Sequence, residues 1–553
     1  MVSTPAIVIA APASGSGKTT VATGLIGALR RAGHRVAPFK VGPDYIDPGY
    51  HGVAAGRPGR NLDPVLVGAE RVLPLYLHGS RDCDIAVVEG VMGLFDGRID
   101  EHNTAPVAEG STAQIAGMLG APVILVVDAR GHSQSLAALL HGFATFDSGI
   151  RLGGVILNRV GSERHEQVLR AACARVGLPV LGALPRLAEL EVPSRHLGLI
   201  PAVEHGAAAL SAVGAMTDLV AAHIDLAAVA ALAASHASGL PWDAEAEIRT
   251  ATGVLASGAA GSILDAWPIG DVRPIGDMRP TGDARPIGDV WPVGDARPVG
   301  DARSIGQTAA DVIAQSDPAQ LRRSAIGDRQ RGALPANATP DDRADGPVIA
   351  VAGGAAFTFG YAEHRELLTA AGAQVAIFDP LHDELPIGTA GLVLPGGFPE
   401  EHAAQLAANL SLLSAVADQA RRGMPVHAEC AGLLYLTRSL DGHTMAGVVD
   451  ADAEFGPRLT LGYRDAVALT DSPLWQTGER VRGHEFHRTR LIRPATASPA
   501  WAWRAPTGET VREGAVPNNV HASYLHTHPA GNPTAIQRFV TAAARHATTH
   551  AGV

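Results

Sequence analysis

The chain has 553 residues, of which 46% are hydrophobic, 18% are charged and only 4% are aromatic, and its formal net charge is −11. A chain of this length exceeds what one hydrophobic core usually organises, so two or more domains are expected. The acidic balance disfavours nucleic acid and anionic membranes as partners. Three cysteines, Cys83, Cys173 and Cys430, are too few and too scattered for a disulfide framework or a zinc cluster, which favours a cytoplasmic protein.

The beginning of the chain indicates neither a signal peptide nor a membrane anchor. Residues 1–20 lack a basic stretch before their short apolar run, and that run leads into a glycine-rich loop, which is typical of a strand. No segment approaches the roughly 18 apolar residues needed to cross a bilayer. We therefore expect no membrane partner.

Residues 1–240 alternate short apolar runs with amphipathic stretches. Such alternation predicts βαβ units and a parallel sheet covered on both faces, and thus a first α/β domain. The expected strands are Ala6–Ala10, Arg35–Phe39, Ile85–Glu89, Val123–Val127, Gly154–Leu157 and Val180–Leu184, with helices such as Lys18–Ala32 and Thr112–Leu119.

A different composition occupies residues 241–345. Six-residue units such as RPIGDV follow one another from Trp267 to Thr308. Their aliphatic-Gly pair has the period of a left-handed β-helix. However, Arg or Trp stands where that fold needs a small inward residue, and each Pro removes a ladder donor. The segment is therefore predicted to be a disordered, low-complexity linker or insert.

A second α/β pattern fills residues 346–548. Its expected strands are Val348–Val351, Gln374–Ile377, Gly391–Leu394 and Pro425–Ala428, with helices at Glu363–Ala371 and Glu400–Arg421. The last hundred residues, rich in His, Arg and Trp, give no clear pattern. We expect this region to form a second domain.

A glycine-rich loop stands between the first predicted strand and helix: Ser14, Gly15, Ser16, Gly17, Lys18, Thr19 and Thr20. This is the arrangement of a P-loop, whose backbone N–H groups and helix dipole hold phosphate oxygens. Lys18 is expected to reach the β- and γ-phosphates of ATP, and Thr19 to bind Mg²⁺. The strict pattern has glycine at position 12, where this chain has Pro12.

Further candidate ligands follow the next two strands, at the sheet edge where ligands bind. Lys40, Asp44 and Asp47 lie in one Pro/Gly-rich segment, and Glu89 ends the third strand. We assign Lys40 to ATP and the three carboxylates to Mg²⁺. Glu89 has the place of a Walker-B-type acid. Asp44 and Asp47 are weaker candidates, because aspartate is common in Pro/Gly-rich turns whether or not it binds a metal.

Cys430 is flanked by small residues, after a predicted strand and before a helical run. A nucleophile above a sheet has this setting, and the helix dipole there is expected to lower the thiol pKa. Cys83 and Cys173 lack it and are interpreted as structural. His526 is the first candidate for the base and His528 the second.

An oxyanion hole is expected near the same thiol. Gly396 and Gly397 follow a predicted strand, where their backbone N–H groups are free to stabilise a developing negative charge. Read alone, the PGG sequence is a turn.

Together these segments resemble the cobyrinate or hydrogenobyrinate a,c-diamide synthase family. The resemblance leaves out residues 241–345 and rests on the combination of blocks. The blocks are APASGSGKTT (11–20), KVGPDYIDPGYH (40–51), VVEGVMGLFDG (87–97), GSTAQIA (110–116), GVILNRVGSERH (154–165), PGGFPE (395–400), AECAGLLYL (428–436), RGHEFH (482–487) and ASYLHTH (522–528).

The resemblance implies a dethiobiotin-synthetase-like P-loop domain, followed by a flavodoxin-like, class I glutamine-amidotransferase domain. Cys430 then matches the glutaminase nucleophile and His526 the histidine that activates it. Class I domains usually carry Glu two residues after that histidine, where this chain has His528, so the third member of the triad is open. Ala428 replaces the first Gly of the usual G-x-C-x-G elbow.

The implied reaction is an amidation that uses ATP·Mg²⁺ and glutamine. ATP would phosphorylate a corrinoid carboxylate, and ammonia released at Cys430 would displace phosphate, twice, on the a and c side chains. A closed route for ammonia between the domains is a further hypothesis. Arg98, Arg159 and Arg164 are candidates for binding substrate carboxylates, or are solvated surface arginines.

Several alternatives remain open. Cobyric acid synthase and Ni-sirohydrochlorin a,c-diamide synthase use the same two modules, and a regulatory P-loop ATPase with a degenerate second domain is the non-enzyme reading. The cobalt-free ring is slightly favoured over the cobalt-bearing one. Two-module enzymes of this kind are expected as homodimers.

Overall fold

The computed structural model describes residues 3–99, 105–186, 194–195, 198–199, 202–257, 346–492 and 496–550. Both α/β regions belong to one compact unit. The predicted repeat from Trp267 to Thr308 lies outside the described residues. No helix among those residues is both long and apolar enough to span a membrane.

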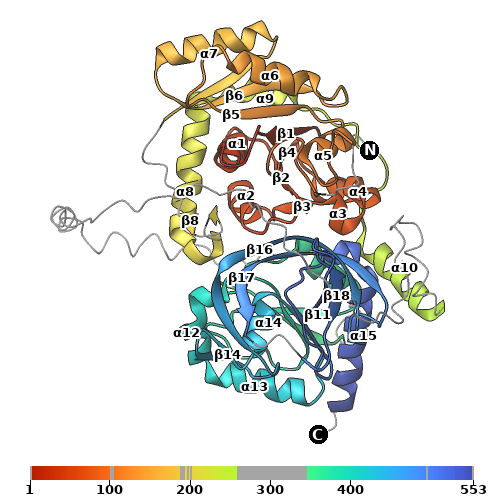
Figure 1. Cartoon of the computed structure of the whole chain (residues 1–553). Helices are drawn as coiled ribbons and strands as arrows, with labels where there is room; N and C mark the ends of the chain where they lie inside the picture. Colours follow the sequence, from red (N-terminus) through yellow and green to blue (C-terminus); the bar gives the residue numbers. More distant parts are fainter. Residues whose placement is uncertain are drawn as a thin grey trace, which may run out of the picture. The chain divides into compact units, whose positions relative to one another are not determined.

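The N-terminal region is a seven-stranded, wholly parallel sheet in the order β3-β2-β4-β1-β5-β6-β7. Helices cover both faces (Figure 1). As a result, Ile7 and Ile9 join one core cluster while Ala6 and Val8 of the same strand join another. The strands are β1 Ala6–Ala10, β2 Val36–Val41, β3 Arg60–Leu62, β4 Ile85–Glu89, β5 Val123–Asp128, β6 Leu152–Val160 and β7 Val180–Pro185.

The helices of this region include every one expected from the sequence. They are α1 Lys18–Arg31, α2 Asp47–Ala55, α3 Pro64–Val67, α4 Ala69–Gly79, α5 Thr112–Leu119, α6 Leu136–Thr145, α7 Glu163–Arg175, α8 Ala202–His223, α9 Leu226–Leu232 and α10 Ala244–Ser257. A two-stranded ribbon, β8 Ser194–Arg195 and β9 Gly198–Leu199, precedes α8.

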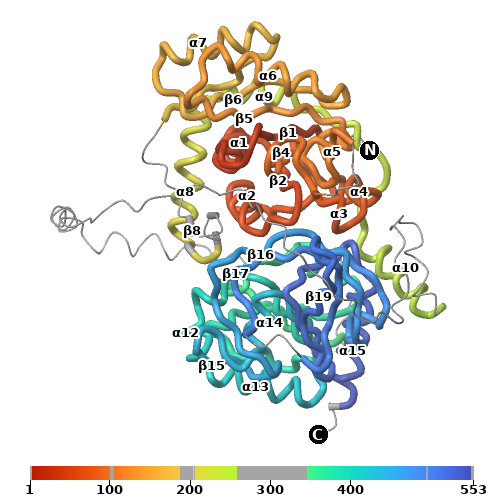
Figure 2. Tube along the Cα trace, viewed as in Figure 1, coloured from red at the N-terminus to blue at the C-terminus, as the bar shows by residue number. Residues whose placement is uncertain are grey.

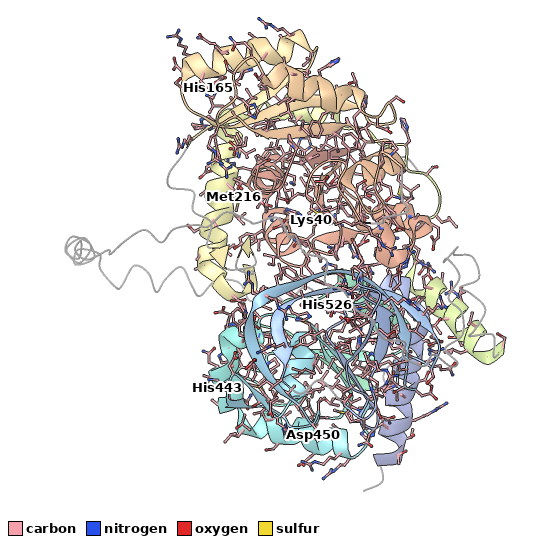
Figure 3. All side chains as sticks on the ribbon, in the orientation of Figure 1. Lys40, His165, Met216, His443, Asp450 and His526 are labelled. Carbon is pink, nitrogen blue, oxygen red and sulfur yellow. The ribbon has the colours of Figure 1, made fainter. Side chains whose placement is uncertain are left out.

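Helix α1, which carries the phosphate loop at its start, packs closely on α8. A Cβ at Gly24 would lie 2.4 Å from the carbonyl oxygen of Met216, which Figure 3 labels on α8. A Cβ at Gly27 would lie 2.1 Å from Oγ1 of Thr217. The two glycines therefore let the helices approach each other and fix α1 beneath the loop.

The C-terminal region contains a five-stranded parallel sheet in the order β11-β10-β12-β13-β20. Renumbered within the region this is 2-1-3-4-5, the flavodoxin-like order, so the predicted fold class is confirmed. The strands are β10 Val348–Ala352, β11 Gln374–Phe378, β12 Thr389–Leu394, β13 Val426–Glu429 and β20 Val520–Ser523; the helices are α11 Ala362–Ala370, η2 Pro399–His402, α12 Ala403–Ala408, α13 Leu410–Arg421, α14 Ala431–Leu436, η3 Pro529–Gly531 and α15 Pro533–His550.

A second sheet, mostly antiparallel, occupies much of the stretch whose sequence gave no clear pattern. Its order is β15-β14-β16-β18-β19, with β17 paired to β16. The strands β16 and β17 run beside each other as a long ribbon (Figure 2). The members are β14 Ser439–Leu440, β15 His443–Thr444, β16 Asp452–Ala468, β17 Arg480–Leu491, β18 Trp501–Arg504 and β19 Thr510–Glu513.

Two segments differ from expectation. The single helix expected over Glu400–Arg421 is divided into η2, α12 and α13, because Asn409 leaves helical geometry and its side chain caps α13 by accepting from the N–H of Leu412. The start of the predicted linker forms α10, which packs against α11 and α15, where Ile248 and Ala251 are buried. The amphipathic pattern of residues 244–257 explains this helix, whereas the composition of the neighbouring repeat predicts a linker.

Candidate functional site

The predicted phosphate loop joins β1 to α1 with a backbone that glycine alone adopts easily. Gly15 and Gly17 have φ of 76° and 94°. A Cβ at Gly17 would lie 2.2 Å from Nδ2 of Asn158, and that amide donates to the carbonyl oxygen of Ser16 at 2.9 Å. The end of β6 therefore holds the loop in place from the side.

The candidate substrate arginines are largely engaged by the protein. Arg159 donates to the carbonyl oxygen of Gly15 at 3.0 Å and pairs with Asp128 at 2.5 Å. Arg98 pairs with Glu109 at 3.2 Å and also with Asp465. Arg159 thus supports the phosphate loop, while Arg164 is exposed at the start of α7.

Lys18 is buried at the start of α1, and its Nζ lies 2.5 Å from the carbonyl oxygen of Met92. Burial, followed by the charge of Lys40, lowers the pKa of Lys18 to about 8. An anion placed beside this ammonium would raise the pKa of Lys18 again, because it would favour the charged form.

Lys40, Asp47 and Glu89 form a buried cluster with the hydroxyl of Thr19. Nζ of Lys40 lies 2.5 Å from Asp47 Oδ2 and 2.9 Å from Glu89 Oε1 (Lys40 is labelled in Figure 3). Oγ1 of Thr19 lies 2.7 Å from Glu89 Oε1 and 3.2 Å from Asp47 Oδ2. The structure therefore brings these four predicted residues together, with Asp44 farther away at 3.8 Å from Lys40.

The charges of this cluster are mutually dependent. Burial would lower the pKa of Lys40, but the carboxylates of Asp47 and Glu89 outweigh burial and hold it above its ordinary value. Burial would raise the pKa of Glu89, but Lys40 and His51 hold it below its ordinary value. Sequence reasoning missed His51, whose Nε2 lies 2.6 Å from Glu89 Oε2; its place at the end of the KVGPDYIDPGYH segment was the available signal.

Cys430 stands at the turn between β13 and α14, as the elbow pattern predicts. Its φ of 48° and ψ of −97° are unusual for a residue with a Cβ, and its N–H donates to the carbonyl oxygen of Ser523 at 2.7 Å. The turn places the thiol at the carboxyl edge of the five-stranded sheet. Cys83 and Cys173 have no such setting, and all three cysteines are free.

The expectation of a lowered thiol pKa is wrong for this geometry. Burial, followed by the charge of Glu400, raises the pKa of Cys430 above its ordinary value. The N–H groups of Ala431 and Gly397 direct hydrogen bonds toward the sulfur and only partly oppose the rise. The thiol is therefore neutral at rest, and a base must remove its proton.

The segment Pro395–Phe398 links this thiol to His526. A Cβ at Gly396 would lie 2.3 Å from Cε1 of His526, and one at Gly397 would lie 2.2 Å from the carbonyl oxygen of Ala356. Gly397 directs its N–H toward Cys430, whereas Gly396 has its carbonyl bonded to the N–H of Phe359 at 3.0 Å. Ala431, which sequence reasoning missed, supplies a second N–H directed at the sulfur.

His526 and His528 have different surroundings although they are two residues apart. Figure 3 labels His526, which is fully buried, with Nδ1 lying 3.7 Å from Oε2 of Glu429. His528 packs its ring on Tyr361 with centroids 4.0 Å apart, and its Nδ1 accepts from the N–H of Ala530. Burial lowers the pKa of His528 to about 4, so His528 is neutral.

An aromatic contact connects the segment that carries Asp47 with the predicted base. Tyr45 and His526 have ring centroids 5.0 Å apart, and Tyr45 stacks on Phe359 at 4.9 Å. The hydroxyl of Tyr361 donates to that of Tyr45 at 2.9 Å. The N-terminal and C-terminal regions thus each place a ring, Tyr45 and Phe359, beside His526.

Glu513 offers a test of the electrostatics near this edge. It is partly buried and accepts from Ser523 Oγ at 2.6 Å and from the N–H of Tyr524 at 2.8 Å. Burial raises its pKa to about 8, so the folded protein binds a proton that the unfolded chain releases near pH 4.5. Stability from this group is complete below about pH 4.5 and is lost as pH rises toward about 8.

We therefore expect Glu513→Gln, which cannot ionise, to gain stability relative to the parent protein as pH rises. The gain should be on the order of 1 kcal/mol per pH unit between about pH 5 and 8. Urea unfolding of both proteins across this range measures the difference. A difference that does not change with pH would contradict the protonated state of Glu513.

Comparisons with known proteins cover both regions. A family model described as a CobQ/CobB/MinD/ParA nucleotide binding domain matches residues 7–200, and one described as a CobB/CobQ-like glutamine amidotransferase domain matches residues 348–534. Hydrogenobyrinate a,c-diamide synthase of Mycobacterium tuberculosis is 53% identical over 539 residues, 98% of each chain. The enzyme of the same name from Streptomyces coelicolor is 51% identical over 97% of each chain. Cobyrinate a,c-diamide synthase of a Synechococcus species is 35% identical over 97% of this chain and 98% of its own.

Proposed function

Because this chain belongs to the family of hydrogenobyrinate and cobyrinate a,c-diamide synthases, we propose that it amidates the a and c carboxylates of hydrogenobyrinate in cobalamin biosynthesis. It is a carbon–nitrogen ligase that uses ATP, with glutamine as the amido donor. The observation that carries the proposal is that one chain contains both a phosphate loop and a cysteine elbow and is 53% identical, over 98% of its length, to a relative of this name.

The nucleotide side activates the carboxylate. Free carboxylate does not react with ammonia, since oxide is a poor leaving group, so transfer of the γ-phosphoryl group must first give an acyl phosphate. Lys18, the N–H groups of the loop and the start of α1 position the phosphates, which is most of what phosphoryl transfer requires. Lys40 pairs with the carboxylates of Asp47 and Glu89.

The oxygens of Thr19, Asp47 and Glu89 suit Mg²⁺, which prefers hard oxygen ligands and is held by one or two carboxylates together with phosphates and water. Their mutual distances of 2.7 Å and 3.2 Å already bring the three oxygens to one point. When bound, the ion would neutralise charge on the phosphate oxygens. Among the described residues no group of three His, Cys, Asp or Glu side chains is arranged to hold a metal ion.

The glutaminase side supplies ammonia. His526 takes the proton of the Cys430 thiol, the sulfur attacks the amide carbon of glutamine, and the N–H groups of Gly397 and Ala431 stabilise the oxyanion. The proton returns to the leaving ammonia, and water hydrolyses the glutamyl thioester. Ammonia then displaces phosphate from the acyl phosphate.

The cobalt-free ring is the proposed substrate because the relatives named for hydrogenobyrinate are 43–53% identical, whereas those named for cobyrinate are 34–36% identical. The cobalt-bearing ring is the second candidate. We place the enzyme in the cytoplasm and expect it to act as a homodimer, with residues 1–240 and 346–548 as its two domains.

The test is amidation of both rings by the purified protein. With ATP, Mg²⁺ and glutamine, hydrogenobyrinate should show two successive mass losses, each replacing a hydroxyl by an amino group. The rate should exceed that with cobyrinate. If the rate of ATP hydrolysis were the same with and without either ring and no amide product formed, the proposed function would be refuted and the regulatory ATPase favoured.

A further inference from the structure

The glutaminase site contains a carboxylate that the usual class I pattern does not include. Glu429 immediately precedes Cys430 at the end of β13, and its side chain is largely buried, with 12% of its surface exposed. Its neighbour His427 lies on the same strand, beside Phe539 of α15 and His364 of α11. The carboxylate therefore lies within the protein, beneath the nucleophile's own turn.

One oxygen of this carboxylate is fixed by three donors. Oε1 accepts from Oγ1 of Thr527 at 2.9 Å, from the N–H of Thr527 at 3.1 Å and from Nε2 of His427 at 3.2 Å. These bonds favour the charged form, and although burial would raise the pKa of Glu429, they and His526 hold it well below its ordinary value. Glu429 is thus an anion with a fixed orientation.

The other oxygen faces the catalytic base. Oε2 lies 3.7 Å from Nδ1 of His526, and neither ring nitrogen of His526 has a hydrogen-bond partner within the part of the chain that the structure describes. A distance of this size shortens to a hydrogen bond with a small movement of the ring, as catalytic contacts do when substrate binds. The geometry supplies an acceptor for Nδ1–H, which leaves Nε2 free to take a proton.

The residue in the usual place for this role does not fill it. His528 is neutral and its Nδ1 accepts a hydrogen bond from the N–H of Ala530, which caps η3. Its ring packs on Tyr361. A neutral group engaged in this way cannot stabilise an imidazolium, whereas an anion 3.7 Å away can.

We propose that Glu429 is the positioning residue of the glutaminase: it orients His526 through Nδ1 and stabilises the imidazolium that forms when the Cys430 proton moves to Nε2. The carboxylate keeps its own charge throughout, and the proton passes from Sγ to Nε2 and then to the departing ammonia. A cavity of about 10 Å³ lined by Glu429, His427 and Thr527 holds at most one water molecule, which is too little room for glutamine. This inference rests on the proposed function.

The test compares Glu429→Gln with the parent enzyme in two assays, driven by glutamine and by ammonia. Gln keeps the size of the side chain but offers an amide N–H₂ to Nδ1, which favours the wrong tautomer of His526. We expect kcat with glutamine to fall by about 100-fold or more, while KM for glutamine changes less than about threefold. Amidation with ammonia should be unchanged, which also shows that the variant is folded.

Three further variants separate positioning from a structural role. In a His526→Ala background, Glu429→Gln should cause no additional loss of glutamine-driven kcat, because a residue that acts through His526 has nothing left to act on. Glu513→Gln, which changes a glutamate on β19 that accepts from Ser523 and Tyr524 and not from His526, should keep both activities. Thr527→Val, which removes one donor to Oε1, should lose about three- to tenfold of the glutamine-driven kcat alone.

The outcomes distinguish this inference from the proposed function. Equal losses with glutamine and ammonia, or losses that multiply with His526→Ala, would make Glu429 a structural residue and overturn the inference. Retention of full glutamine-driven turnover by Glu429→Gln would overturn it as well. Absence of amidation by the parent enzyme with either nitrogen source would instead refute the proposed function.

Discussion

Replacing Cys430 with alanine is expected to reduce glutamine-driven amidation by at least about 1,000-fold while leaving ammonia-driven amidation within about twofold of the parent enzyme. The reason is that the thiol alone can form the glutamyl thioester, whereas the acyl phosphate is made at the phosphate loop. Alanine is smaller than the buried cysteine that it replaces, so it fits the site and the fold should persist. Initial rates with saturating glutamine or ammonium chloride at pH 8 measure the two activities.

Cys173→Ala is the matched control for this variant. Cys173 is another buried, free cysteine, on α7 and away from the elbow, so its removal should affect both activities equally and little. If Cys430→Ala retained glutamine-driven turnover, a different residue would have to be the nucleophile. If it lost ammonia-driven turnover as well, Cys430 would have to contribute to the synthetase site.

Replacing Lys18 with alanine is expected to abolish amidation from both nitrogen sources, with a loss of at least about 100-fold in kcat. The ammonium of Lys18 neutralises phosphate charge in the transition state, and neither glutamine nor ammonia can substitute for it. In the structure Lys18 donates to the carbonyl oxygen of Met92. In the variant this oxygen loses its donor and would accept from water or from the ligand instead. ATP-dependent phosphate release and product mass, recorded together, give the result.

The glutaminase site provides the internal control for Lys18→Ala. A glutamine analogue that alkylates the nucleophile should still label Cys430, because the phosphate loop takes no part in thiol attack. Labelling at the parent rate with no amidation would locate the defect in phosphoryl transfer. Amidation that persisted above about a tenth of the parent rate would remove Lys18 from the proposed mechanism.

The sequence sufficed for most strands of both parallel sheets because these strands are continuous apolar runs, but it did not predict β3 or β20. Ala6–Ala10 and Ile85–Glu89 were predicted with the bounds that the structure has. A buried parallel strand needs no partner-specific pattern, only length and β-branched residues. The long strands β16 and β17 were not predicted, since one face is solvated and their charged residues find partners only after folding, as Arg464 does with Glu485.

The site was predictable where one local motif carries it, and less so where distant segments meet. The phosphate loop and Cys430 lie in strand–turn–helix patterns, and the structure places both as the patterns indicate. The prediction of a lowered pKa for the Cys430 thiol was wrong because burial under other segments outweighs the helix dipole. His51 and Glu429 were not predicted as site residues, since their contacts with Glu89 and His526 form only in the folded chain.

The PGGF segment has a consequence for how such a chain can evolve. A side chain at position 396 would enter the ring of His526, and one at position 397 would enter the carbonyl oxygen of Ala356. Neither clash can be avoided by moving the end of a flexible side chain, because the first is with the ring of the base and the second is with backbone. Single substitutions at these two positions should therefore be selected against while the glutaminase is needed. A lineage that had come to rely on free ammonia would be released from the constraint at position 396, which comes from the base, and a side chain there would mark the change, whereas position 397 would stay closed by the backbone of Ala356.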